Sequence, residues 1–238
     1  PGHEASGVVE SLGPGVTHLE VGDHVVLTPA PPCGQCYYCQ RDQQNLCTNA
    51  MGILTGTLPD GSTGLSLNGE QVFRGCGIGA LAEYVTLPAT GAIKIDKDIP
   101  LDVACVIGCA LQTGVGAVLN TAEMEAGATC VVLGLGGIGM AAIQGARIAG
   151  ASVIIASDPV AERRDKAIGF GATHVVDPVN EDINALVMTL TAAIGVDYAF
   201  EAAGKAALIE QGIQMTRMGG TTVIVGSPAI EENLTIPN

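Results

Sequence analysis

Apolar and polar positions follow one another in a regular order over the C-terminal half of the chain. Short apolar runs rich in β-branched residues alternate there with longer helical stretches, which predicts strands separated by helices. This order is typical of a parallel, doubly wound α/β sheet with right-handed crossovers. We expect strands to begin near residues 130, 152, 173, 196 and 221, and helices to span 138–149, 160–169, 181–190 and 205–218.

The N-terminal half has shorter strand patterns that are separated by turns. Between residues 48 and 79 turn residues and glycines are frequent, so we expect an irregular surface excursion there. The stretch 100–121 is apolar and rich in alanine, which favours a partly helical structure. The expected strands of this half lie at 7–11, 23–28, 80–88 and 92–95.

The strand at 130–135 runs directly into a glycine-rich turn and a helix. Gly134, Gly136 and Gly139 fill the pattern G-x-G-x-x-G at this junction. Such a turn is too tight for a Cβ, its backbone approaches a pyrophosphate closely, and its helix packs tightly against the strand. The N-terminus of helix 138–149 offers free N–H groups and the positive end of a dipole to phosphates. The stretch is therefore predicted to bind a dinucleotide.

An acidic residue follows the second strand of this half. Strand 152–157 ends at Asp158, 19 residues after Gly139, where a carboxylate accepts hydrogen bonds from an adenosine ribose. Asp158 would repel the 2′-phosphate of NADP, so NAD is the expected cofactor. Arg163 and Arg164 follow closely, and their positive charge acts against that preference.

The composition narrows the classes of function. The 238 residues carry 10 Lys and Arg against 24 Asp and Glu, a formal net charge of −14, which disfavours nucleic acid and anionic membranes as partners. No apolar run approaches the ~20 residues of a membrane span, and no secretory signal opens the sequence. We therefore expect a cytoplasmic, reducing setting, in which the eight cysteines are ligands or core residues rather than disulfides.

Four cysteines lie close together in one loop. Cys33, Cys36, Cys39 and Cys47 are separated by two, two and seven residues, and thiolates at such spacings can surround one tetrahedral ion. Disulfides are the first alternative, but three cysteines within seven residues pair with difficulty. An iron–sulfur cluster of the bacterial ferredoxin type is the second alternative. It would need a three-residue last gap followed by Pro, and this chain has neither. We expect a structural zinc ion in this zinc lobe, residues 33–47.

Two further pairs of residues have ordinary interpretations when residue type alone is considered. His3 and Glu4 are adjacent, which is typical of a solvated turn. Cys105 and Cys109 lie on an apolar stretch, where a cysteine is usually a small core residue.

Four motifs make the chain resemble the zinc-containing medium-chain alcohol dehydrogenases, which combine a GroES-like, mainly β catalytic domain with a Rossmann coenzyme domain. The motifs are PGHEASGVVESLGPGV at the start, the four-cysteine lobe, IGCALQTG at 107–114, and GLGGIG together with Asp158. They occur in the order of the family and cover essentially the whole chain. The resemblance implies a GroES-like domain at 1–112 and a Rossmann domain at 113–238.

The resemblance also implies roles for individual residues. His3 and Cys109 would ligate a catalytic zinc ion, with Glu4 as the carboxylate near the metal, and Thr113 would face the nicotinamide. The cysteines of the zinc lobe would hold the structural ion. The implied cofactor-binding residues are Thr113, Gly134, Leu135, Gly136, Gly137, Ile138, Gly139, Asp158, Arg163, Val225, Gly226 and Ser227.

The resemblance further implies a reaction. Zinc lowers the pKa of a bound alcohol so that the alkoxide delivers hydride to NAD⁺, and in the reverse direction zinc polarises a carbonyl. The nicotinamide supplies the redox chemistry. The implied partner is a small-molecule alcohol or aldehyde, and the parent enzyme would be a homodimer or a homotetramer.

Two features of the family have no counterpart between Pro1 and Asn238. A third catalytic-zinc ligand, a Cys, precedes the motif that contains His3, and a sixth strand follows the fifth. We therefore expect an internal fragment that binds zinc in the lobe and turns over slowly or not at all. Its fifth strand, 221–226, would be an uncovered apolar edge.

Details of the chain narrow the expected substrate. The excursion after Cys47 resembles the longer-loop members, which include liver-type and glutathione-dependent formaldehyde dehydrogenases. The glutathione-dependent members have an Arg four residues after the last lobe cysteine, where this chain has Met51. We therefore expect a neutral primary or aromatic alcohol. Ala110 and Leu111 replace the more usual Gly and aromatic residue, which leaves the shape of the pocket open.

Two alternative functions compete with this interpretation. A zinc-free quinone reductase of the same superfamily is one, but those proteins generally lack both metals, and the four-cysteine lobe argues against it. A non-catalytic dinucleotide-binding sensor is the other. It would keep the Rossmann domain and the zinc lobe without a working catalytic metal site.

Overall fold

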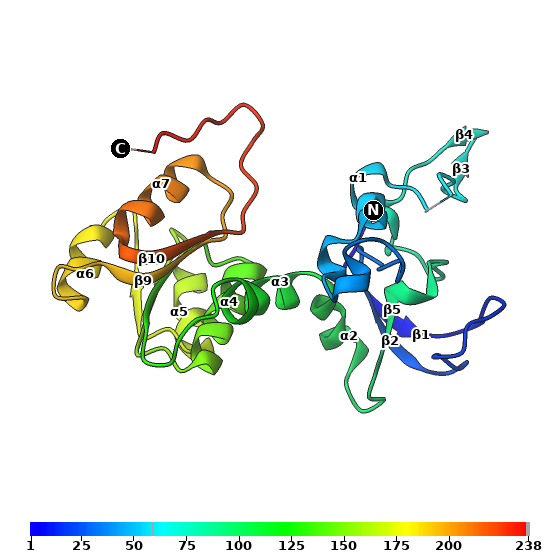
Figure 1. Ribbon diagram of the computed structural model, residues 1–238, viewed down its shortest axis with the longest axis horizontal. Coiled ribbons are helices and arrows are strands. Elements are labelled where there is room, and N and C mark those ends of the chain that lie inside the picture. The colour runs from blue at the N-terminus through cyan, green and yellow to red at the C-terminus, as the bar shows by residue number, and fades with distance from the viewer. Residues whose placement is uncertain (59, 237–238) are drawn as a thin grey trace. The chain divides into compact units, whose positions relative to one another are not determined.

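The computed structural model describes residues 1–58 and 60–236. The chain forms two compact units, an N-terminal unit of Pro1–Cys109 and a C-terminal unit of Ala110–Asn238 (Figure 1). The boundary expected from the sequence, between residues 112 and 113, lies three residues further along the chain.

Five parallel strands form the sheet of the C-terminal unit, in the order β10-β9-β6-β7-β8. Strand β6 is central, and its Val131 and Val132 are fully buried, as expected for a parallel strand covered on both faces. After β6 the chain builds β7 and β8 on one side and then returns to build β9 and β10 on the other, so the topological switch point lies between β6 and β9. The strands are β6 (Thr129–Leu133), β7 (Val153–Ser157), β8 (His174–Val176), β9 (Val196–Glu201) and β10 (Thr216–Ile224).

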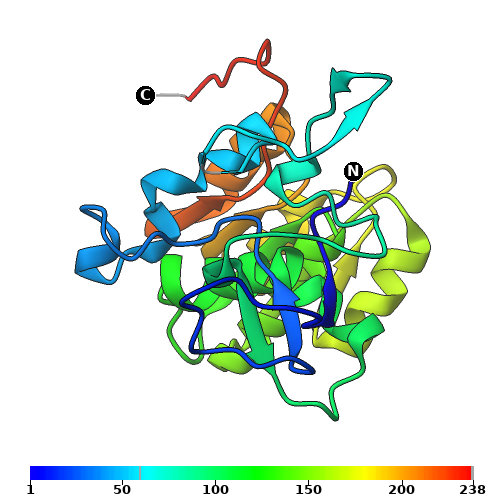
Figure 2. The same cartoon turned by 90° about the vertical axis from the view of Figure 1, so that its right-hand side faces the viewer.

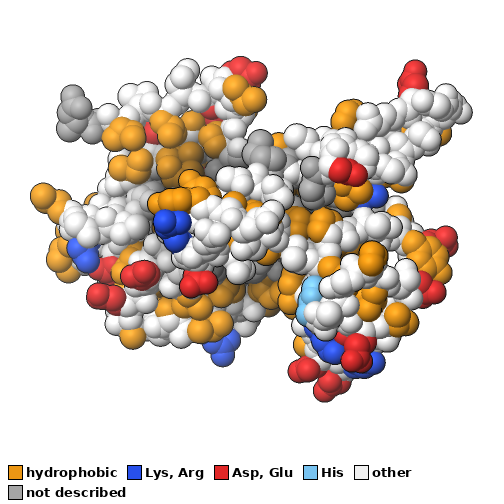
Figure 3. All heavy atoms as spheres, turned by 45° about the vertical axis from the view of Figure 1, so that its right-hand side comes forward, with side chains coloured by type: hydrophobic (Ala, Val, Ile, Leu, Met, Phe, Trp, Pro, Cys, Tyr) orange, Lys and Arg blue, Asp and Glu red, His pale blue; other side chains and the backbone are white. Residues whose placement is uncertain are grey.

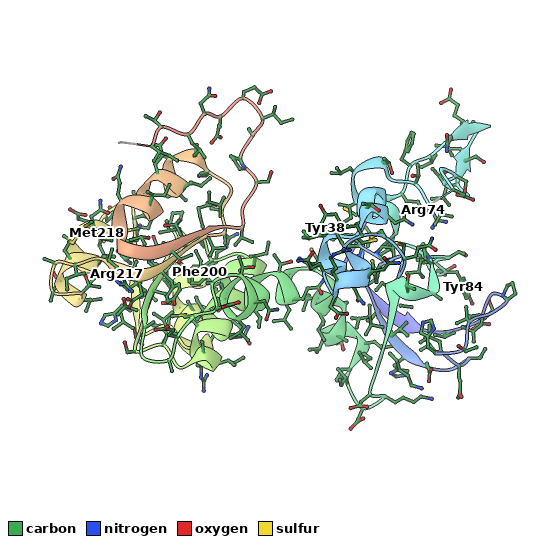
Figure 4. The ribbon with its side chains drawn as sticks, in the orientation of Figure 1. Tyr38, Arg74, Tyr84, Phe200, Arg217 and Met218 are labelled. Atoms are coloured by element: carbon green, nitrogen blue, oxygen red, sulfur yellow. The ribbon has the colours of Figure 1, made fainter. Side chains whose placement is uncertain are left out.

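Helices cover both faces of this sheet (Figure 1). Helices α4 (Gly137–Ala149) and α5 (Ala161–Phe170) pack on one face, over a core that includes Phe200 (labelled in Figure 4). Helices α6 (Ile183–Leu190) and α7 (Ala206–Met215) pack on the other face. The prediction of a doubly wound α/β sheet is therefore confirmed.

The N-terminal unit is built on a small antiparallel sheet in the order β1-β2-β5 (Figure 2, dark blue, blue and green). These strands are β1 (Ser6–Val8), β2 (His24–Leu27) and β5 (Ala92–Ile95). Beneath them lies a small core of Leu19, Val25, Leu27 and Ile78. A separate hairpin joins β3 (Ser66–Leu67) to β4 (Glu70–Gln71).

Short helices connect the strands of the N-terminal unit and open the C-terminal unit. In the N-terminal unit these are η1 (Cys39–Arg41), η2 (Gln44–Leu46), η3 (Thr48–Met51), α1 (Gly52–Thr55), η4 (Gly75–Gly77), η5 (Ala89–Gly91), α2 (Leu101–Ala104) and η6 (Cys105–Gly108). The C-terminal unit begins with α3 (Ala110–Gly116) and the π-helix η7 (Ala117–Thr121).

Three expectations about elements differ from the structure. The strand expected at 80–88 is wrong, because residues 82–88 have no hydrogen-bonded strand partner within the described ranges. The helix expected to reach Met218 ends at Met215, and β10 begins at Thr216 instead of near residue 221. The excursion 48–79 is less irregular than expected, since it contains the β3-β4 hairpin.

The surface carries the acidic character of the composition. On the face drawn in Figure 3, acidic side chains are more numerous than basic ones.

Among the described residues no single helix has the length and apolar composition to span a membrane, and one bent pair, Leu101–Gly108 with Ala110–Thr121, passes that test by length and composition only.

Candidate functional site

The glycine-rich turn joins β6 to α4 at the carboxyl edge of the parallel sheet. Gly134 has φ +92°, a conformation that favours glycine, and its N–H donates to the Ser157 carbonyl at 2.9 Å. Gly136 is the N-cap of α4, makes no side-chain cap, and would have open space around an added Cβ. A Cβ on Gly139 would lie 1.9 Å from the Gly134 carbonyl oxygen. The turn thus exposes backbone N–H groups at a helix N-terminus, the geometry that binds phosphate groups.

Asp158 lies at the end of β7, next to this turn, and its side chain is 3% exposed. Its Oδ2 accepts the Leu135 N–H at 2.9 Å and its Oδ1 accepts the Val160 N–H at 2.8 Å. Burial alone would raise the pKa of Asp158, but these two N–H groups and Arg163 outweigh that effect and lower the pKa below its ordinary value. A carboxylate is therefore fixed beside the turn.

Two arginines of α5 approach Asp158 in different ways. Arg163, whose side chain is half exposed, contacts Oδ2 of Asp158 at 3.3 Å. Arg164 is more buried, donates to the backbone carbonyl of Asp158 at 2.6 Å, and pairs with Asp177 at 3.2 Å. The second guanidinium is thus bound to the end of β8 rather than to the carboxylate of Asp158.

The segment after β10 lies against the end of β9. The carbonyl oxygen of Glu201 accepts the N–H groups of Val225 at 2.8 Å and of Gly226 at 3.0 Å. A Cβ on Gly226 would lie 2.1 Å from the Gly204 nitrogen, so the segments 202–205 and 225–227 are in close contact. Both segments lie at the same edge of the sheet as the glycine turn, because Ala203 contacts Gly134.

The four cysteines of the zinc lobe come together in the structure. Their sulfur atoms all lie within 4.8 Å of one another, and the Cys36 and Cys47 Sγ atoms are 3.9 Å apart. A tetrahedral ion with zinc–sulfur bonds of about 2.3 Å requires sulfur atoms about 3.8 Å apart. A disulfide would require about 2.0 Å. The set therefore fits a zinc ion, and the cysteines are free thiols.

Backbone N–H groups surround these sulfur atoms. The N–H groups of Cys33 and Asn49 donate to Cys47 Sγ at 3.3 and 3.4 Å. The backbone N–H groups of Cys39 and Thr48 lower the pKa of the Cys36 thiol to about 5, whereas burial raises the pKa of the Cys39 thiol to about 11. Such N–H donors stabilise the thiolates that a metal ion needs as ligands.

The residues expected around a catalytic zinc belong to segments that meet at Leu27 in β2. The Leu27 N–H donates to the Ala5 carbonyl at 2.9 Å, directly after Glu4. The Leu27 carbonyl oxygen lies against Gly108, directly before Cys109, so closely that an added Cβ would be 2.0 Å away. Within the described residues, the four-cysteine lobe is the only cluster of three or more metal-binding side chains. The segments therefore meet, while the assignment of His3, Glu4 and Cys109 as ligands stays a prediction.

Thr113 lies on α3, which packs against α4 within the C-terminal unit, and its side chain is partly exposed. Glu201 was not singled out by the sequence, and Arg164 was noted there only as a positive charge close to Asp158. An acidic residue at the carboxyl end of a parallel strand was the available signal for Glu201. For Arg164 the signal was its place immediately after Arg163.

Comparison with known proteins is consistent over both units. Residues 1–97 match the alcohol dehydrogenase GroES-like domain, and residues 137–238 match the zinc-binding dehydrogenase family. An S-(hydroxymethyl)glutathione dehydrogenase from Paracoccus denitrificans is 39% identical over 99% of this chain, which covers 66% of that protein.

Solved structures agree with these matches. An alcohol dehydrogenase zinc-binding domain protein from Burkholderia ambifaria is 36% identical, with a TM-score of 0.91, over 99% of this chain and 64% of that one. Benzyl alcohol dehydrogenase from Acinetobacter calcoaceticus is 31% identical, with a TM-score of 0.88, over 100% of this chain and 64% of that one. The chain thus spans about two thirds of the length of these relatives. The GroES-like domain and the Rossmann-type sheet are confirmed, and the chain belongs to the zinc-binding medium-chain alcohol dehydrogenase family.

Proposed function

We propose that the protein is an NAD-dependent zinc alcohol dehydrogenase, which transfers hydride between a primary or aromatic alcohol, or its aldehyde, and NAD(H). The observation that carries this proposal is the buried carboxylate of Asp158, bonded to the Leu135 N–H inside the glycine turn. A fixed carboxylate beside a phosphate-binding turn fits a ribose with both hydroxyl groups free, and it repels a 2′-phosphate.

Within the C-terminal unit, each part of the cofactor has its own proposed set of binding residues. The backbone of Gly134, Leu135, Gly136, Gly137, Ile138 and Gly139 and the N-terminus of α4 bind the pyrophosphate. Asp158 accepts hydrogen bonds from the adenosine ribose, and Arg163 lies beside it. Val225, Gly226 and Ser227 bind the carboxamide, and Thr113 faces the nicotinamide ring.

We propose two zinc ions, one in the zinc lobe and one for catalysis. His3 and Cys109 would hold the catalytic ion, with Glu4 beside it, and imidazole nitrogen and thiolate sulfur are ligands that zinc prefers. When bound, zinc supplies a Lewis acid that lowers the pKa of an alcohol. The nicotinamide of the bound cofactor would supply the redox chemistry.

Two substrate classes have support. The similarity to a benzyl alcohol dehydrogenase and the presence of Met51 four residues after Cys47 favour a neutral alcohol. The side chain of Met51 lies outside what the structure describes. The similarity to an S-(hydroxymethyl)glutathione dehydrogenase makes a glutathione adduct the second candidate.

Three measurements on the purified chain test the proposal. We expect NADH to bind and zinc to be present at one or more ions per chain. We expect any alcohol oxidation to be faster with benzyl alcohol than with S-(hydroxymethyl)glutathione. A faster rate with the glutathione adduct would overturn the substrate assignment alone. A zinc-free chain that reduces quinones would favour the quinone reductase, and a chain that does not bind NADH would overturn the proposal.

We further propose a homodimer or homotetramer in a reducing, cytoplasmic setting. The free cysteines of the zinc lobe suit a reducing compartment. Among the described residues β10 is the edge strand on its side of the sheet, and Met218 on it is 97% exposed (labelled in Figure 4). The mass of the protein in solution, measured by light scattering, tests the oligomeric state, and a monomer at micromolar concentration would contradict it.

A further inference from the structure

Glu201 is a fully buried carboxylate at the carboxyl end of β9. Its Oε1 accepts the N–H groups of Ala203 at 3.0 Å and of Lys205 at 3.3 Å. Its Oε2 is one of the two buried side-chain atoms without a hydrogen-bond partner among the described residues. A buried carboxylate oxygen without a partner is costly, so its presence at this edge of the sheet requires an explanation.

No cation of the described chain compensates this charge. The ion pairs of the described residues involve other carboxylates, namely those of Asp23, Asp158, Glu162, Asp177 and Asp197. Within the described residues Glu201 therefore has two backbone N–H donors on Oε1 and no Lys or Arg at ion-pair distance, so a negative charge on its carboxylate is available to a positively charged ligand nearby.

The position of Glu201 indicates where such a ligand lies. Its Oε2 would be 2.6 Å from a Cβ on Gly226, and its backbone carbonyl oxygen accepts hydrogen bonds from the N–H groups of Val225 and Gly226. These residues follow β10 at the edge of the sheet to which we assigned the cofactor. The segment 225–227 is the part of the proposed site that takes the nicotinamide end.

We propose that Glu201 determines the preference of the site for the oxidation state of the cofactor. This inference rests on the proposed function. The oxidised nicotinamide ring carries a positive charge and the reduced ring is neutral, so an uncompensated buried carboxylate behind segment 225–227 favours NAD⁺ over NADH. The preference comes from the charge of Glu201 and not from its shape.

The test compares the dissociation constants of NAD⁺ and NADH for the full chain and for E201Q. The amide of Gln keeps the oxygen that accepts the Ala203 and Lys205 N–H groups and removes the charge. We expect NAD⁺ binding to weaken by about tenfold and NADH binding to change by less than about twofold, as for the loss of a buried unit charge acting over several ångströms. An equal change for both forms, or no change, would overturn the inference.

Two further variants keep the result interpretable. D197N removes a unit charge from the opposite end of the same strand, where Asp197 pairs with Arg217, and should leave the ratio of the two dissociation constants unchanged. E201D keeps the charge but moves it by about one carbon–carbon bond, so it should change the ratio less than E201Q does, and a change as large as that of E201Q would contradict the role of charge. A wild-type chain that binds neither form would instead overturn the proposed function.

Discussion

Alanine at Gly136 and alanine at Gly139 should have opposite consequences, although the two glycines lie three residues apart in one turn. An added Cβ at Gly139 would be 1.9 Å from the Gly134 carbonyl oxygen and 3.0 Å from its carbon. Real Cβ contacts essentially never fall below 3.0 Å, so the helix and the turn must separate by about 1 Å. At Gly136 nothing lies within 4 Å of the added atom. G139A therefore disturbs the fold, and G136A leaves it intact.

The magnitudes follow from these distances. Overpacking of this kind costs about 1–3 kcal/mol, and each kcal/mol lowers the melting temperature of a unit of this size by roughly 4 °C. We expect G139A to lower the melting temperature by roughly 4–12 °C. We expect G136A to shift it by less than about 2 °C but to weaken NADH binding by at least about tenfold, because the new methyl group occupies the side from which a pyrophosphate approaches.

Thermal unfolding followed by circular dichroism and NADH titration followed by fluorescence measure the two effects separately. ADP-ribose serves as a second ligand, because it keeps the pyrophosphate and lacks the nicotinamide. Wild-type NADH affinity in G136A would refute the assignment of the turn to the pyrophosphate. A loss of stability in G136A as large as that in G139A would refute the distance argument.

Three other predictions follow from separate parts of the molecule. C47S should lose the lobe zinc ion, measured by elemental analysis, whereas C105S should keep it, because Cys105 Sγ donates to the Asp102 carbonyl outside the lobe. D177A should release the Arg164 guanidinium and lower the dissociation constant of NADPH relative to NADH by several-fold in fluorescence titrations, and an unchanged ratio would contradict the restraint by Asp177. Burial opposes the ionisation of Asp197, but the Thr129 N–H and Arg217 outweigh it and lower the pKa below 3.8, so the folded state binds this proton less readily than the unfolded state. Its contribution to stability is present above about pH 4 and is lost as the pH falls further; acid titrations should therefore show a smaller loss of stability below pH 4 in D197N than in the wild type.

Much of the C-terminal unit was predictable because its strands are buried on both faces. A continuous apolar run such as that in β6 can be placed from the sequence without knowledge of its neighbours. The end of α7 could not be placed in this way. The hydroxyl group of Thr216 donates to the Gly212 carbonyl and also bonds Thr222 at 2.8 Å, and these contacts depend on where β10 lies.

The N-terminal unit was harder to predict because its strands need partners. The alternation in 80–88 is that of a strand, but a strand requires a neighbour that supplies hydrogen bonds, and a local pattern carries no information about neighbours. The β3-β4 hairpin, in contrast, had a local signal. Asn68 and Gly69 connect its strands with φ +53° and +85°, as in the turn that the dipeptide Asn-Gly favours.

The same distinction separates the two candidate sites. The proposed phosphate-binding turn consists of backbone atoms and one carboxylate within a short stretch of sequence, so residue type and spacing define it. The proposed catalytic metal site depends instead on Leu27, whose N–H holds the Ala5 carbonyl and whose own carbonyl leaves no room for a side chain at Gly108. Because Leu27 is an ordinary apolar strand residue in the sequence, nothing local marks it. The spacing between the segments of His3 and Cys109 thus depends on main-chain atoms of a residue that has no metal-binding chemistry, which is why the sequence alone does not reveal it.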